Sequence, residues 1–104
     1  MGDDTAVSGW KQMWGARVKW PADMPDDMLK DAVQTVGRVF DEFPDFESDG
    51  DKVVEHVKLQ FDERWNPSWH CIIGKNFGSF VTHETKRFVY FYYGDKAVML
   101  YKVG

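Results

Sequence analysis

The stretch from residue 65 to residue 102 constrains the fold most, because it reads as a succession of short β-strands. Its apolar segments are rich in Val, Ile, Phe, Tyr, Trp and Thr, the residue types that fit a pleated sheet. Turn residues separate them at positions 74–76, 84–87 and 94–95. The pattern predicts four strands, at residues 69–73, 77–83, 88–93 and 97–102, in a mostly antiparallel sheet.

The strand predicted at residues 77–83 is unusual because it contains two small residues, Gly78 and Ser79, which weaken a strand. We expect this strand to lie at an edge of the sheet. A sheet edge leaves backbone N–H and C=O groups unpaired, so it can accept a strand from another chain.

Upstream of the strands, apolar residues recur at helical spacing. A helix is predicted from the Pro25-Asp26 region to Phe43, and a second from about residue 51 to 64, with a loop at 44–50 between them. Gly37 in the first helix costs about 1 kcal/mol relative to Ala, so it indicates a close approach of another element. With a short strand at 16–20, these elements predict an α+β fold with two helices on one face of an antiparallel sheet.

Length and charge restrict the functional classes. A chain of 104 residues corresponds to one domain. Residues 1–63 hold seven Lys/Arg and fifteen Asp/Glu, a balance of −8, whereas residues 64–104 hold six and two, a balance of +4. This distribution argues against nucleic acid, and leaves open whether the basic half attracts acidic peptides or is only solvated.

The location of the protein follows from what the sequence contains. Cys71 is the single cysteine, which suits a reducing compartment, and no apolar run reaches the length of a membrane span. We therefore expect a cytosolic protein that binds no membrane. Residues 1–16 are expected to form a flexible extension, in which Trp10 and Trp14 either dock on a surface or stay free.

No catalytic or metal-binding constellation is evident. His70 and Cys71 are adjacent on a strand, so their side chains are expected on opposite faces, with Cys71 buried. The acidic series at positions 45, 47, 49 and 51 lacks the closing glutamate of a calcium loop. The sequence predicts no enzyme, no cofactor and no metal, and it leaves recognition of an extended peptide at a sheet edge as the best hypothesis.

The candidate groove for such a peptide is lined by alternating side chains of two strands. Core positions are expected at Val89, Phe91, Val98 and Leu100. The groove positions are Phe77, Ser79, Val81, Phe88, Tyr90 and Tyr92.

The run NPSWHCIIGKNFGSFVTHETKRFVYFYYG, with weaker similarity through LQFDERWNP and ADMPDDM, closely resembles the small, eight-kilodalton dynein light chain family. The resemblance covers residues 17–104, so these form the light chain domain and residues 1–16 lie outside it. It implies a non-catalytic homodimer in which the strand at 77–83 is exchanged between subunits. Clients, including dynein intermediate chains, would bind as added strands at the dimer interface, so that the protein acts as a dimerisation hub in the cytoplasm and cytoskeleton.

Carried over residue by residue, the resemblance assigns two sets of site residues. The dimer interface would comprise Lys58, His70, Ser79 and Phe80. The peptide-binding residues would be Asn76, Phe77, Gly78, Ser79, Phe80, Val81, Thr82, His83, Phe88, Tyr90 and Tyr92.

Departures from the family pattern put client preference in question. Phe80 replaces a tyrosine of the crossing strand, and Gly50-Asp51 stands where a Glu-Lys pair caps a client glutamine. Val103 replaces a serine, which removes a phosphorylation site. Because the N-terminal extension has no family counterpart, an alternative is a dedicated structural subunit of an axonemal or other cytoskeletal complex, without exchangeable clients.

Overall fold

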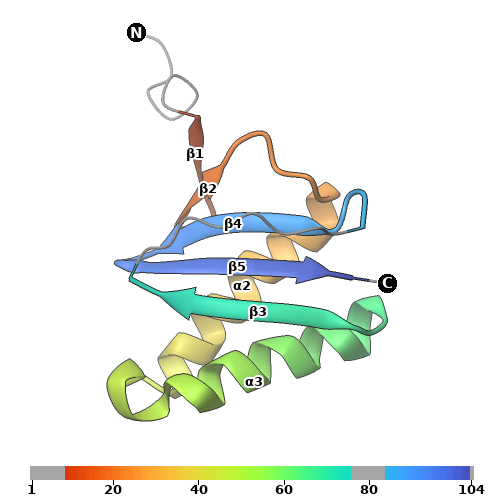
Figure 1. Cartoon of the computed structure of the whole chain (residues 1–104). Coiled ribbons are helices and arrows are strands. Elements are labelled where there is room, and N and C mark those ends of the chain that lie inside the picture. The colour runs from red at the N-terminus through yellow and green to blue at the C-terminus, as the bar shows by residue number, and fades with distance from the viewer. Residues whose placement is uncertain (1–8, 76–83, 104) are drawn as a thin grey trace, which may run out of the picture.

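The computed structural model describes residues 9–75 and 84–103, which form an antiparallel sheet with two helices on one of its faces (Figure 1). The predicted α+β class is therefore confirmed. The exchange of a strand between subunits concerns residues outside the described ranges and stays a prediction. The elements are β1 (Trp10–Met13), β2 (Ala16–Lys19), α2 (Asp26–Glu42), α3 (Phe46–Trp65), β3 (Trp69–Gly74), β4 (Phe88–Tyr93) and β5 (Lys96–Lys102).

The sheet has the strand order β1-β2-β4-β5-β3, and every pair is antiparallel. β5 lies between β4 and β3, pairing Phe88 with Tyr101 on one side and Trp69 with Lys102 on the other. The three strands predicted at 69–73, 88–93 and 97–102 are confirmed within a residue at their ends. The strand predicted at 77–83 lies outside the described residues.

Both helices bury an apolar stripe against the same face of the sheet. α2 packs on β4 and on α3, and α3 packs on β3; in Figure 1, α2 runs behind the strands and α3 lies along β3. The expected core positions Val89, Phe91, Val98 and Leu100 are fully buried there, which confirms that prediction.

The second helix begins earlier than its sequence pattern predicts. α3 starts at Phe46, so most of the predicted loop at 44–50 is helical. Asp45 is the N-cap: its carboxylate accepts hydrogen bonds from the Ser48 N–H at 3.4 Å and the Ser48 hydroxyl at 2.9 Å. Glu47 and Asp49 also lie in the first turn, where their negative charges interact favourably with the positive end of the helix dipole and stabilise the start of α3.

Gly37 marks a close approach between helix and sheet, as predicted. A Cβ atom at this position would lie 2.5 Å from the hydroxyl oxygen of Tyr93, on β4, and 2.9 Å from its Cζ. The Tyr93 ring is held in turn by an edge contact with Phe40, at 5.7 Å between centroids. Only a residue without a side chain lets α2 reach this ring.

A polar cluster joins the two helices on the side away from the sheet. The Asp31 carboxylate of α2 accepts hydrogen bonds from the Arg64 guanidinium and from the Trp65 indole N–H, the latter at 2.8 Å. Thr35 and Gln60 complete the cluster through the same arginine. It fixes the end of α3 against the middle of α2.

The sequence did not predict β1, which lies in the extension expected to be flexible. β1 forms a hairpin with β2 through the turn Trp14-Gly15, where both residues have positive φ, at 51° and 85°. A hydrogen bond from the Trp20 N–H to the Gly9 carbonyl, at 2.7 Å, closes its open end. Trp10 thus belongs to the sheet.

Candidate functional site: the edge of β3 and the outer face of the sheet

β3 occupies the end of the sheet next to α3. Its register with β5 runs from Trp69↔Lys102 to Gly74↔Ala97, and within residues 9–75 and 84–103 no strand pairs with its other side (Figure 1). Such an edge presents backbone donors and acceptors at the spacing of an extended chain. The described part of the molecule therefore offers a site for one more strand beside β3.

Side chains of β3 alternate between the two faces of the sheet. His70 and Ile72 are exposed on the outer face, whereas Cys71 and Ile73 pack against the helix-side core. The prediction that His70 and Cys71 point to opposite faces is confirmed. Burial raises the pKa of the Cys71 thiol to about 12, so the sulfur stays protonated at neutral pH and is unsuited to nucleophilic attack.

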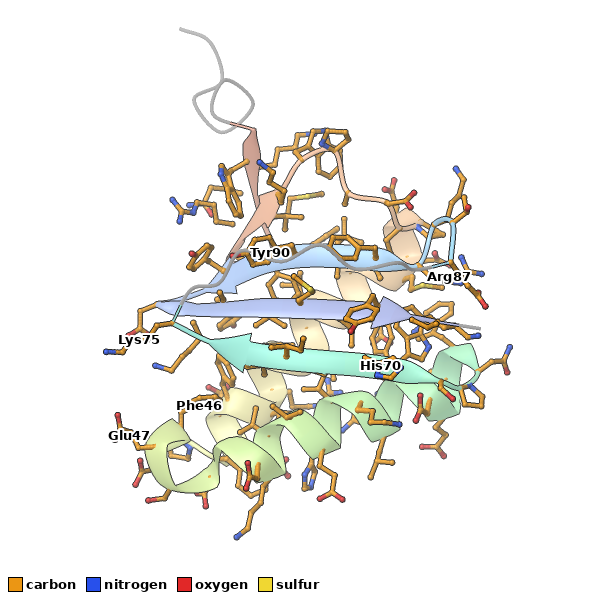
Figure 2. The ribbon with its side chains drawn as sticks, viewed as in Figure 1. Phe46, Glu47, His70, Lys75, Arg87 and Tyr90 are labelled. Atoms are coloured by element: carbon orange, nitrogen blue, oxygen red, sulfur yellow. The ribbon has the colours of Figure 1, made fainter. Side chains whose placement is uncertain are left out.

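Two residues assigned to the dimer seam, Lys58 and His70, lie around one carboxylate. Asp62 of α3 accepts hydrogen bonds from the Lys58 ammonium and, at 2.7 Å, from the Trp69 N–H. Desolvation acts to raise the pKa of Asp62, but Lys58, the Trp69 N–H and the nearby His70 outweigh it, and the pKa is lowered. Figure 2 shows His70 on β3, where it stacks on Tyr101 with 5.3 Å between ring centroids.

The outer face of β4 carries the aromatic residues expected to line a groove. Phe88, Tyr90 and Tyr92 are half-buried and alternate with the buried Val89 and Phe91. Their neighbours on β5 are Tyr101, Met99 and Ala97, in that order. Neither helix covers this face, so the structure brings the three predicted groove residues of β4 together on it.

The structure adds a residue that the sequence reasoning left undecided. The Trp10 ring lies on the outer face, with its centroid 5.8 Å from that of Tyr90 and 5.6 Å from that of Tyr92. Part of the signal for this hairpin was available, since Trp14-Gly15 is a two-residue turn with glycine second and an alternating run, Ala16–Lys19, follows it.

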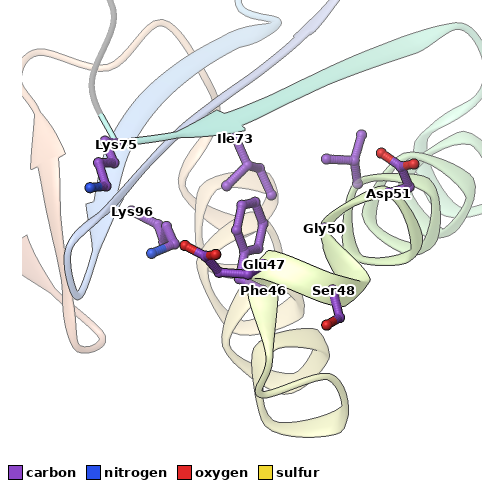
Figure 3. A pocket seen from close by; sticks show the side chains of 9 residues that line it. Phe46, Glu47, Ser48, Gly50, Asp51, Ile73, Lys75 and Lys96 are labelled. Carbon is purple, nitrogen blue, oxygen red and sulfur yellow. The ribbon is translucent and has the colours of Figure 1, made fainter.

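A cavity of about 440 Å³ lies between the first turns of α3 and the end of β3 (Figure 3). Gly50 and Asp51, aligned above with the family's client-capping pair, line it together with Glu47, Ile73 and Lys75. Gly50 leaves room for the Phe46 ring, whose Cζ would lie 3.3 Å from an added Cβ. Carboxylates and ammonium groups thus both face this cavity, which suits a polar side chain of a ligand.

The remaining predicted site residues cannot be placed. Ser79 and Phe80 of the seam, and the whole peptide-binding segment of residues 76–83, lie outside the described residues. Among the residues that the structure does describe, no three His, Cys, Asp or Glu side chains are grouped to hold a metal ion. None of the described helices is long and apolar enough to cross a membrane.

Within residues 9–75 and 84–103, the two-helix α+β domain leaves one side of β3 unpaired, an arrangement that suits the binding of another polypeptide strand. The model of the family "Dynein light chain type 1" matches residues 16–103, and the chain belongs to this dynein light chain family. Members of the family are generally structural, non-catalytic adaptors associated with the cytoskeleton.

Solved structures support the fold. A mercury derivative of the dynein light chain-like domain of the Fasciola hepatica calcium-binding protein FhCaBP2 superposes with a TM-score of 0.79 at 14% identity, covering 90% of this chain and 97% of that one. A native crystal form of the same domain gives a TM-score of 0.67 at 16% identity, covering 80% and 86%. At this identity the likeness concerns the fold alone.

Proposed function

We propose that this protein is a homodimeric, non-catalytic light chain that binds short extended segments of client proteins by β-strand addition. Residues 77–83 of one subunit would pair with the edge of β3 in the other. A client segment, from a dynein intermediate chain or another disordered partner, would then add as the next strand. The observation that carries the proposal is the absence of a second neighbour for β3 within the described residues.

The arrangement of side chains supports this order of strands. Lys58 and His70 lie beside the edge of β3, where the partner strand would arrive. The cavity lined by Glu47, Asp51 and Lys75 opens at the end of the same strand. It would receive a polar client side chain, while backbone pairing supplies affinity with little demand on sequence.

Two such grooves on one dimer would hold two client chains side by side. Once the first client copy is bound, the second contact is effectively intramolecular, and linked chains gain avidity without any new contact. The protein would thereby promote dimerisation of its clients and assembly of the motor, and would work in the cytoplasm and on the cytoskeleton.

The dimer is tested by sedimentation velocity at micromolar concentration and neutral pH. We expect the wild type to sediment as a dimer. His70→Lys, which puts a permanent charge on the seam, should shift the equilibrium toward monomer. His56→Lys is the matched control, because His56 is exposed on α3, away from β3. A wild type that is monomeric throughout the concentration range contradicts the proposal.

A second candidate is a dedicated structural subunit of one axonemal or cytoskeletal complex. The observation in its favour is Trp10, which covers part of the Tyr90 and Tyr92 surface that clients would share. Affinity capture from lysate separates the two functions. A hub retains many unrelated proteins with a common short motif, whereas a dedicated subunit retains the components of one assembly.

A further inference from the structure

The β1–β2 hairpin carries a basic and aromatic surface on the outer face of the sheet. Cross-strand pairing sets Trp10 opposite Lys19 and Gln12 opposite Arg17, so these four side chains share one face. The Arg17 guanidinium lies 5.2 Å from the centre of the Trp10 ring and 5.0 Å from that of Tyr92. We call Trp10, Gln12, Arg17, Lys19 and Tyr92 the hairpin patch.

The cations of the hairpin patch are available to a ligand. Arg17 and Lys19 are both exposed, and within residues 9–75 and 84–103 neither forms an ion pair with a carboxylate. Their contacts are with aromatic faces, which position the charges and leave the N–H donors free for an anion. In a chain of net charge −4, this is a local reversal of sign.

A shallow cavity of about 260 Å³ lies within the patch, lined by Gln12, Gly15, Arg17, Tyr92 and Gly94. Guanidinium, amide and phenol groups together can hold a carboxylate by several hydrogen bonds. At the tip of the hairpin, the Trp14 side chain is 38% exposed. Its φ of 51° is unfavourable for a residue with a large side chain. Its indole offers an apolar contact next to the polar cavity.

β1 also provides a second open edge. It pairs with β2 alone among the described residues, and it lies at the opposite end of the strand order from β3. An extended polypeptide can therefore pair with its backbone while acidic side chains reach the hairpin patch.

We propose that the hairpin patch binds an acidic, extended segment of another protein, with Arg17 and Gln12 holding a carboxylate and β1 pairing with the segment's backbone. This inference goes beyond the light-chain function above, because it concerns a different edge of the sheet, formed by β1, which lies before the family match that begins at residue 16.

Single-stranded nucleic acid also binds basic and aromatic surfaces. The peptide is favoured because an open strand edge is useful only to a polypeptide backbone. The patch holds two cations, Arg17 and Lys19, too few for the phosphate-tracking groove of a nucleic-acid-binding protein.

The test uses the full chain and a short fluorescein-labelled peptide of alternating Glu and Val, with binding followed by fluorescence anisotropy at low salt. Arg17→Glu and Lys19→Glu should each weaken binding by about tenfold or more, because each turns an attraction into a repulsion. Lys30→Glu is the matched control: it makes the same charge change at an exposed site on α2 and should have little effect. A probe methylated on alternate backbone nitrogens should bind more weakly than the plain peptide.

Three results would each overturn the proposal. One is equal weakening by Arg17→Glu, Lys19→Glu and Lys30→Glu, which would mean attraction by overall charge. Another is unchanged binding of both methylated probes, one with methyl groups on the odd-numbered backbone nitrogens and one with them on the even-numbered nitrogens. The last is tighter binding of an oligothymidine of matched charge than of the peptide. Sedimentation of the same variants should remain that of the wild type, so failure here is distinct from failure of the dimer proposed above.

Discussion

Whether Gly37→Ala stabilises or destabilises the protein should depend on the ring of Tyr93. In an ordinary helix, Gly→Ala stabilises by about 1 kcal/mol because Ala loses less backbone entropy. Here the new methyl group would lie 2.5 Å from the Tyr93 hydroxyl and 2.9 Å from Cζ. Overpacking of this kind costs about 1 to 3 kcal/mol, and the contact with Phe40 restrains the ring from moving away. Gly37→Ala should therefore lower the free energy of unfolding by up to about 2 kcal/mol.

Removing the ring should reverse the sign. In a Tyr93→Ala background the methyl group meets no ring, so Gly37→Ala should raise the free energy of unfolding by about 1 kcal/mol. The four proteins of this double-mutant cycle are compared by urea unfolding followed by circular dichroism, at one protein concentration because dimerisation would couple to stability. The same sign of the Gly37→Ala effect in both backgrounds would refute the steric reading of this glycine.

Three further predictions concern single side chains. Asp31→Ala removes the acceptor of the Trp65 indole N–H and the carboxylate that pairs with Arg64, and should lower the free energy of unfolding in urea by about 1 to 2 kcal/mol. Asp41→Ala, at an exposed site on the same helix, should be near neutral. The pKa of Asp62 is lowered from its ordinary value of 3.8, so the charged carboxylate stabilises the fold above pH 3.8, and this stability is lost as the pH falls through the lowered pKa. Asp62→Asn should therefore reduce the loss of unfolding free energy at acid pH, and an unchanged pH dependence would exclude the role. The Cys71 thiol, with its pKa raised to about 12, should react with iodoacetamide far more slowly at pH 9 in the native protein than in urea.

Strands and helices were predictable where apolar residues recur at a regular spacing because one face of the element is buried. The alternation of Phe88 to Tyr93 and the helical spacing after Pro25 both correspond to elements of the structure. Gly37 was predictable too, because a glycine inside a strong helical pattern has few explanations other than close packing.

The wrong predictions concern segments whose structure depends on one local interaction and whose apolar residues have no regular spacing. Acidic and small residues at 44–50 suggested a loop, but the side-chain cap from Asp45 lets the helix start at Phe46. β1 was missed because its four residues show little apolar alternation; it exists through its pairing with β2 and the contacts of Trp10 with two tyrosines. The predicted interface of Lys58 and His70 came from resemblance. Lys58 and Asp62 are four residues apart, the spacing of an ion pair on a helix, but no rule of spacing would have joined His70 to them.

The position of β5 has a consequence for biosynthesis. It follows every other strand along the chain, yet it is the strand on which both β3 and β4 pair. While a ribosome is still translating residues 96–102, the β3 segment lacks its only partner among the described strands, and the helices have no finished surface to cover. The apolar stripes of α2 and α3, which are synthesised earlier, therefore stay uncovered until β5 emerges, and this favours early engagement of a chaperone.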